Sequence, residues 1–207
     1  HDPQLLPLGQ HLSQRESAFL CWLCHIDLSS PNMRVLNLLK PMTSYYDALT
    51  FSRSSYVPTD WDETKIHIFP PAIDPSTQKN TPLALEDARA LVTEAGVDPN
   101  RPLICQVSRF DPWKDPWGVI DVFRSVKKKI PDLQLAMLGL AQASDDPEFA
   151  EILTSVSDHA ESDPDIHLLW DPSPWEGRID RLVNAFQVWS NVIIQKSLRE
   201  GFGLTVT

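Results

Sequence analysis

Two cationic side chains, Arg109 and Lys114, lie close together in the sequence SRFDPWK. A guanidinium group can donate two parallel hydrogen bonds to phosphate oxygens, and an ammonium group adds a compact positive charge. Because Pro112 restricts the backbone between them, this pair suits the binding of a diphosphate. The alternative is a surface loop in which the cations pair with Asp111 and Asp115, and the spacing alone favours that alternative.

A second candidate lies near the end of the sequence, where Glu200 precedes the glycines Gly201 and Gly203, with Phe202 between them and Leu204 after them. Glycine lets the backbone approach a ligand closely, and its amide group can point at an anion. A helix beginning near Leu204 would add the positive end of its dipole to the same phosphate. A tight strand-to-helix turn without a ligand explains this pattern equally well.

Polar pairs in the first half of the chain, His1 with Asp2 and His25 with Asp27, could orient a sugar hydroxyl or take part in acid–base chemistry. A structural histidine beside a strand is the more common explanation for such a residue. The sequence has no cluster of histidine, cysteine and aspartate with the spacing of metal ligands, so we predict no metal site.

The net charge of -10 argues against binding to nucleic acid or to an anionic membrane, because both need a positive surface field. No apolar run approaches the length of a membrane-spanning helix. Three cysteines are too few for a disulfide framework, which favours a reducing, cytoplasmic environment. Cys21 and Cys24 have the spacing of a redox or zinc pair, but they lie in an apolar, strand-like run, so we expect buried thiols.

The elements that must position these residues are clearest in the second half. Apolar runs predict strands, and helical periodicity predicts helices between them. The predicted strands are 103–107, 133–138, 166–170 and 192–195, and the helices are 119–129, 146–159 and 178–189. This alternation favours an α/β fold with a parallel sheet. Ligands of such sheets bind outside the carboxyl ends of the strands, where both candidate segments lie.

The first half is less regular but has the same character. We expect strands at 19–26, 48–52 and 66–69, with a helix at 32–46. Residues 71–82 are rich in proline, aspartate, serine and asparagine and predict a linker between two α/β units. The helix predicted at 83–95 belongs either to that linker or to the second unit.

Taken together, the motifs SRFDPWK, VNAFQ and SLREGFGLTVT resemble the nucleotide-sugar domain of retaining GT-B glycosyltransferases. Within that group, HDPQ, CHIDLSSPN and PPAIDP…KN resemble the trehalose glycosyltransferring synthase family. The resemblance covers essentially the whole chain in order. It implies two Rossmann-like domains of GT-B type, both incomplete in this chain. Residues 1–72 would be the latter part of the acceptor-side domain, 73–100 a linker and connecting helix, and 101–207 the nucleotide-sugar-binding domain.

The resemblance also implies roles for single residues. Arg109 and Lys114 match the pair that grips the donor diphosphate and balances the leaving nucleotide. This pair replaces the divalent metal of other transferases, so no metal or other cofactor is implied. Glu200 matches the first of two glutamates and lies beside the donor sugar, while residues 201–204 line the phosphates and the sugar. The cleft-facing motifs of the acceptor-side domain would contribute His1, Asp2, His25 and Asp27.

The implied reaction moves glucose from a nucleotide-diphosphate donor to C1 of free glucose with retention, which gives α,α-trehalose. The implied partners are a sugar nucleotide, glucose and trehalose, without nucleic acid or membrane, and a homo-oligomer is compatible with them. One alternative is a trehalose phosphorylase, which uses phosphate in place of a nucleotide. Another is a non-catalytic module that binds sugar nucleotides.

The sequence departs from the family pattern at three places. Leu23 stands where an arginine is expected, which puts one cleft contact in doubt. Trp189 occupies a helix position that is usually small, and we expect a change in packing there. The second glutamate of the family would follow Thr207 directly. We therefore expect the chain to end inside the donor site and to be inactive by itself.

Overall fold

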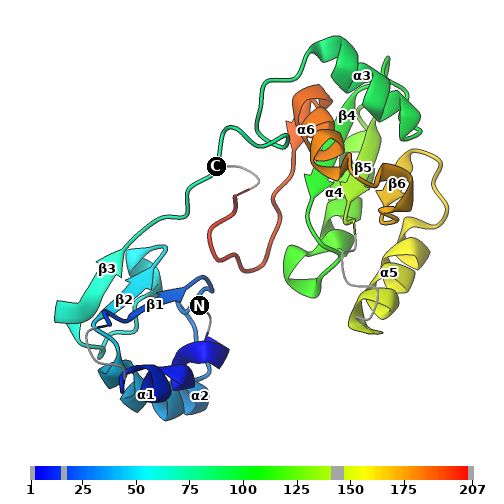
Figure 1. Cartoon of the computed structure of the whole chain (residues 1–207). Coiled ribbons are helices and arrows are strands. Elements are labelled where there is room, and N and C mark those ends of the chain that lie inside the picture. The colour runs from blue at the N-terminus through cyan, green and yellow to red at the C-terminus, as the bar shows by residue number, and fades with distance from the viewer. Residues whose placement is uncertain (1–2, 15–17, 141–146, 205–207) are drawn as a thin grey trace. The chain divides into compact units, whose positions relative to one another are not determined.

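The computed structural model describes residues 3–14, 18–140 and 147–204 (Figure 1). By its internal contacts the chain divides into two compact units. The first comprises the described residues up to Ala72 together with Arg199–Leu204, and the second comprises the described residues of Ile73–Leu198. The division from sequence had placed residues 199–204 in the second domain, whereas their contacts group them with the first unit.

The second unit is built around a parallel sheet with the strand order β6-β5-β4-β7. The strands are β4 (Leu103–Val107), β5 (Gln134–Leu138), β6 (Ile166–Leu169) and β7 (Val192–Ile193). The prediction of four parallel strands in this half is confirmed, and β7 is shorter than expected. Since β4 pairs with both β5 and β7, the loops that follow β4 and β7 leave neighbouring strands at the same edge of the sheet.

Helices cover both faces of this sheet. They are α3 (Leu85–Glu94), α4 (Pro116–Lys127), α5 (Pro147–Ala160) and α6 (Ile179–Trp189), with short 3-10 helices η5 (Pro112–Lys114) and η6 (Ser173–Trp175). Side chains alternate across a strand, so Cys105 packs in the core with α3 and α6, while Ile104 packs in the core with α4 and α5. Burial on both faces explains why β4 reads as a continuous apolar run.

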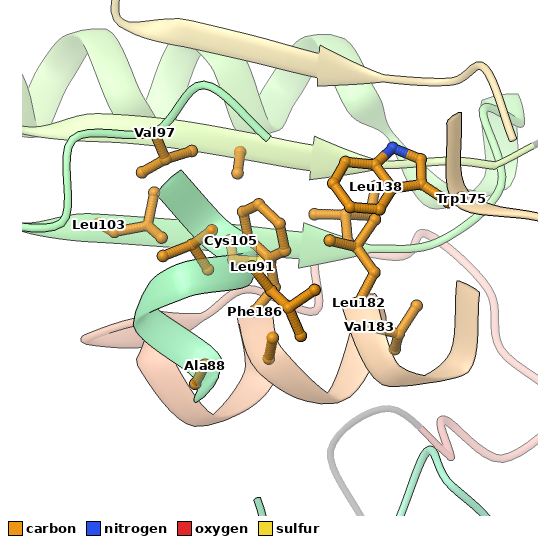
Figure 2. Packing of buried hydrophobic residues seen from close by; sticks show 13 residues of the cluster. Ala88, Leu91, Val97, Leu103, Cys105, Leu138, Trp175, Leu182, Val183 and Phe186 are labelled. Carbon is orange, nitrogen blue, oxygen red and sulfur yellow. The ribbon is translucent and has the colours of Figure 1, made fainter. Parts of the chain in front are cut away.

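Figure 2 shows the core formed by α3 and α6 against the strands. Phe186 and Leu182 of α6 are fully buried there, with Leu91 of α3 beside them. Trp189 is partly buried and packs against the same core.

Asn184 of α6, from the VNAFQ motif, anchors the segment before α3 to that helix. Its side chain is buried and donates hydrogen bonds to the carbonyl oxygens of Gln78 (3.0 Å) and Thr81 (2.7 Å). A buried amide without such partners would destabilise the fold. The asparagine therefore has a structural role in this unit.

The first unit contains a smaller parallel sheet in the order β1-β2-β3. Its strands are β1 (Cys21–Cys24), β2 (Ala48–Phe51) and β3 (Ile66–Ile68). Its helices are α1 (Gly9–Leu12) and α2 (Met33–Leu39), with the 3-10 helices η1 (Pro3–Leu8), η2 (Lys40–Tyr45), η3 (Ser54–Tyr56) and η4 (Glu63–Lys65). The rings of Trp22, Phe51 and Trp61 form the centre of its core, with centroids 5.8–5.9 Å apart.

The single helix predicted at 32–46 is wrong in its second half. Asn32 caps α2 by accepting hydrogen bonds from the backbone of Arg34 (3.1 Å) and Val35 (3.5 Å). The α-helix ends at Leu39, and the chain continues as the 3-10 helix η2. Pro41 explains the change, because proline lacks the backbone N–H that an α-helix requires.

The expectation of buried thiols is confirmed for Cys24 and wrong for Cys21, which is exposed. Residues three apart in a strand point to opposite faces, so the two thiols do not share a site. The sulfur of Cys21 lies 3.2 Å from the hydroxyl oxygen of Thr50 on β2. Among the described residues, no helix is both long and apolar enough to cross a membrane.

Candidate functional site

The loop after β4, residues 108–115, is shaped by side chains of its own unit. Phe110 is buried in the core with α4 and α5, where a Cβ at Gly139 would collide with its ring. The carboxylate of Asp111 accepts a hydrogen bond from the backbone N–H of Trp113 (2.8 Å), which caps η5. The loop therefore has a defined shape directly beyond the carboxyl end of β4.

Arg109 and Lys114 both lie in this loop, as the sequence predicts. The side chain of Arg109 is 78% exposed, and its guanidinium lies 3.6 Å from the carboxylate of Asp111. The carbonyl oxygen of Lys114 accepts a hydrogen bond from the side chain of Gln106 (2.9 Å), a buried residue of β4. That bond ties the backbone of Lys114 to the strand, and the two cations border one edge of the sheet.

Asp115 ends η5 and caps α4. Its backbone lies in the left-handed region (φ 48°), and its carboxylate accepts a hydrogen bond from the N–H of Gly118 (3.1 Å). The same carboxylate contacts the ammonium group of Lys196, in the loop after β7. Sequence reasoning overlooked this pair. The Asp115-Pro116 step is a helix-start signal that could have identified the cap, but nothing local points to Lys196.

The segment Arg199–Leu204 is held by side chains of the first unit. The hydroxyl of Ser52 donates to the carbonyl of Gly201 (2.8 Å), and the hydroxyl of Tyr56 donates to the carbonyl of Glu200 (2.7 Å). Arg53 donates to the carbonyl of Phe202 (3.4 Å) and lies over its ring, 5.5 Å from the centroid. These bonds hold the segment by its backbone.

Two glycines fit this segment for different reasons. A Cβ at Gly201 would collide with the carbonyl oxygen of His25, so only glycine allows that close approach. Gly203 has a φ of 90°, a backbone conformation that residues other than glycine rarely adopt. The structure thus places Gly201 beside His25 and groups Glu200 and Gly203 with the same first unit, while Arg109 and Lys114 belong to the second unit. His1 and Asp2 lie outside the described residues.

Asp27 closes a turn after β1, because its carboxylate accepts a hydrogen bond from the N–H of Ser29 (2.7 Å). It also borders a cavity of about 250 Å³ in the first unit, together with Arg199, Trp22 and Trp61. Both indole N–H groups are buried and have no hydrogen-bond partner among the described residues. A buried donor without an acceptor is costly, so these two indole groups lower the stability of the first unit.

Among the described residues, no three histidine, cysteine, aspartate or glutamate side chains are grouped so that they could hold a metal ion. The arrangement of the loop after β4 can instead bind an anion through the exposed Arg109 and the partly buried Lys114, beside the start of α4, whose N-terminal end carries partial positive charge.

Two sequence families match the chain. The family described as "Trehalose synthase, N-terminal domain" matches residues 1–58, and the family described as "Glycosyl transferases group 1" matches residues 88–207. The second match contains both the loop after β4 and the segment at 199–204.

Proteins named trehalose synthase are similar over the whole chain. That of Rubrobacter xylanophilus is 46% identical, and the match covers 100% of this chain and 49% of the relative. That of Thermococcus litoralis is 44% identical with the same coverage. The chain therefore spans about half the length of the curated relatives it matches.

Solved structures with a similar fold include a UDP-forming α,α-trehalose-phosphate synthase from Burkholderia xenovorans, with a TM-score of 0.73 and 18% identity over 99% of this chain and 53% of that chain. A sucrose-phosphate synthase from Thermosynechococcus elongatus gives a TM-score of 0.66 with 18% identity, over 95% of this chain and 49% of that chain. At these identities the likeness shows the fold alone. The prediction of an α/β fold with Rossmann-like domains of GT-B type is confirmed.

Proposed function

The chain belongs to the glycosyl transferases group 1 family, and on this premise we propose that the protein transfers glucose from a nucleotide-diphosphate donor to C1 of free glucose, with retention, to form α,α-trehalose. The observation that carries this proposal is the similarity of the whole chain to proteins named trehalose synthase. The geometry of the loop after β4 supports the assignment of roles to single residues.

Arg109 and Lys114 would bind the diphosphate of the donor and stabilise the charge that develops on it as the sugar departs. The exposure of Arg109 and the position of both residues beyond β4 suit this role, because open α/β sheets bind ligands at that edge. In this proposal the two cations supply the charge that a divalent metal supplies elsewhere, so the reaction requires no metal cofactor.

Glu200 would lie beside the donor sugar, and residues 201–204 would line the phosphates and the sugar. The hydrogen bonds from Tyr56 and Ser52 support this role, because they fix the backbone of the segment. On the acceptor side the proposed sugar-binding residues are His1, Asp2, His25 and Asp27.

Retention requires that the new bond form on the face from which the nucleotide leaves. The C1 hydroxyl oxygen of the acceptor glucose would attack the anomeric carbon as the bond between that carbon and the phosphate oxygen breaks. The hydroxyl proton would pass to the departing phosphate oxygen, which leaves as part of the nucleoside diphosphate. This route balances without a protein nucleophile.

Calorimetry with UDP and ADP, and with the corresponding glucose donors, tests the donor site. Arg109→Ala and Lys114→Ala should each weaken binding by about tenfold or more, since a hydrogen bond to a charged group contributes about 1.5–3 kcal/mol. Lys129→Ala is a matched control, because Lys129 is exposed just beyond the other end of α4. Equal losses in all three variants, or no binding by the unaltered chain, would contradict the assignment.

The transfer itself is tested with a full-length protein that contains this sequence, by incubating it with the glucose donor and free glucose and measuring nucleoside diphosphate and trehalose, with and without EDTA. Trehalose that forms equally in both conditions supports the proposal. Cleavage of trehalose that depends on phosphate, without use of a nucleotide donor, would support the phosphorylase alternative instead.

A further inference from the structure

The ion pair between Asp115 and Lys196 connects two loops of the second unit. Asp115 follows Lys114 directly, and Lys196 lies after β7, the strand that pairs with β4. The side chain of Asp115 is 18% exposed and that of Lys196 is 37% exposed, so solvent screens this pair less than a fully exposed one. A backbone bond from the N–H of Leu198 to the carbonyl of Trp113 (2.7 Å) links the same two loops.

Several interactions together determine the conformation of Asp115. Its backbone has a positive φ, which costs free energy for a residue other than glycine. Its carboxylate caps α4 through Gly118 and contacts Lys196. A Cβ at Gly118 would collide with both of these side chains, so they would have to shift to make room for it. Lys114 is the residue immediately before this turn, and its direction depends on the turn.

The carboxylate of Asp115 also poses an electrostatic problem for a diphosphate site. It places a negative charge at the start of α4, beside the loop that carries Arg109 and Lys114. An uncompensated carboxylate there would repel a bound phosphate and would offset the positive end of the helix. The ammonium group of Lys196 compensates that charge.

We propose that Lys196 is a positioning residue for the donor diphosphate, acting through Asp115. It neutralises the carboxylate that would otherwise repel the diphosphate, and it holds the left-handed turn that directs Lys114. Lys196 does not itself bind the phosphate in this arrangement. The inference rests on the proposed function, since it assumes that the loop after β4 binds a nucleoside diphosphate.

A double-variant cycle with UDP as the probe separates this role from direct phosphate binding. Lys196→Met should weaken UDP binding by about tenfold, because one partly buried charge is left uncompensated. Asp115→Asn keeps an oxygen to cap Gly118 and should change the affinity by less than about threefold. The double variant should recover most of the loss, since no charge remains to be compensated. If the double variant binds as weakly as Lys196→Met alone, the loss of affinity does not come from the charge of Asp115, and the inference is wrong.

Two further variants control for structure and for charge. Lys196→Arg retains the cation and should retain the affinity. Lys129→Met removes a lysine from an exposed position beyond the other end of α4 and should leave the affinity unchanged. Thermal melting of each variant shows whether the fold persists. A loss of affinity that follows melting temperature across all variants, rather than the charge at the two positions, would overturn the inference.

Arg109→Ala distinguishes failure of the inference from failure of the proposed function. If Arg109→Ala weakens UDP binding and Lys196→Met does not, the donor site stands and only the positioning role is refuted. If the unaltered chain and Arg109→Ala bind UDP equally, or neither binds, the donor site itself is refuted and the inference with it.

Discussion

The two candidate segments are held in different ways, although Gln106 also ties the loop after β4 to its strand through a backbone carbonyl. In the loop after β4, side chains of the loop form the anchors: Asp111 caps η5, and Asp115 caps α4 and contacts Lys196. In the segment Arg199–Leu204, the anchors are backbone carbonyl groups that accept hydrogen bonds from Ser52 and Tyr56. Substitutions should therefore perturb the loop through its charges and the segment through the shape of its backbone.

The units that carry these segments also differ. The sheet of the second unit is covered on both faces by helices of ten or more residues, whereas the first unit combines a smaller sheet with short α- and 3-10 helices. The loop after β4 thus begins on a strand buried from both sides, and its shape should depend most on that core.

Phe186→Ala should have the largest effect, because it removes a fully buried ring from the core between α6 and β4 (Figure 2). We expect the free energy of unfolding to fall by about 3–5 kcal/mol, with faster hydrogen exchange of the amides of β4 and β5. Val188→Ala, on the same helix but 38% exposed, is the matched control. If the free energy of unfolding falls no more for Phe186→Ala than for the control, this core does not support the loop after β4.

Gly201→Ala should release the segment at 199–204 while sparing the loop after β4. The added Cβ would collide with the carbonyl of His25, so the segment must move away from its three side-chain donors. Each hydrogen bond contributes about 1 kcal/mol net, so the free energy that holds the segment against the first unit should fall by about 2–3 kcal/mol. Trypsin cleavage after Arg199 measures this release.

Gly177→Ala is the control for Gly201→Ala. A Cβ at Gly177 would meet no atom within 4 Å, so only the positive φ of 73° is strained. Cleavage after Arg199 should stay unchanged in this variant. If both glycine variants accelerate that cleavage equally, the contact with His25 is not what requires glycine at 201.

The sequence predicted the sheet of the second unit well because each strand is a largely apolar run, as in Leu103–Val107, where Gln106 is the one polar residue. The prediction failed in the second half of the helix expected at 32–46, where Pro41 interrupts the α-helix. It also failed at the end of the last strand, because the pairing of β7 with β4 stops after Ile193. An apolar run therefore predicts that a strand is present more reliably than it predicts where the strand begins and ends.

The candidate site was only partly accessible from the sequence. Arg109 and Lys114 share one loop, so their proximity follows from a short stretch of chain. The contact between Asp115 and Lys196 joins residues 81 positions apart and depends on β7 lying beside β4. The cavity beside Trp22 and Trp61 depends on packing between elements that no local pattern encodes.

Lys127→Met should change the acid sensitivity of the second unit. Lys127 contacts Asp163 (3.0 Å) and Asp165 (2.7 Å). The hydrogen bond from Lys127 is the main cause that lowers the pKa of Asp165, and Arg101 adds to it. A lowered carboxyl pKa stabilises the fold above the unfolded value of about 3.9. That contribution is lost as the pH falls through the folded value.

Urea unfolding between pH 7 and pH 3 measures this contribution. The free energy of unfolding of the unaltered chain should fall below about pH 4. That of Lys127→Met should be lower at neutral pH and should fall less on acidification. Lys40→Met provides the comparison in the first unit, because its partner Asp60 is exposed and solvent screens that pair. A steeper acid loss in Lys127→Met than in the unaltered chain would contradict the assigned coupling.

Tyr56→Phe should have the smallest effect of the series, because it removes one hydrogen bond to the backbone of Glu200 and leaves the ring in place. We expect a loss of about 1 kcal/mol in the docking of the segment, seen as about fivefold faster trypsin cleavage after Arg199. Tyr45→Phe, which removes a hydroxyl from an exposed tyrosine of η2, is the control. Loss of this one anchor should weaken the docking of the segment more than it weakens UDP binding, because the affinity for UDP depends mainly on Arg109 and Lys114 in the loop after β4. If Tyr56→Phe weakened UDP binding while leaving the cleavage unchanged, the contrast between a loop held by its charges and a segment held by its backbone would not hold.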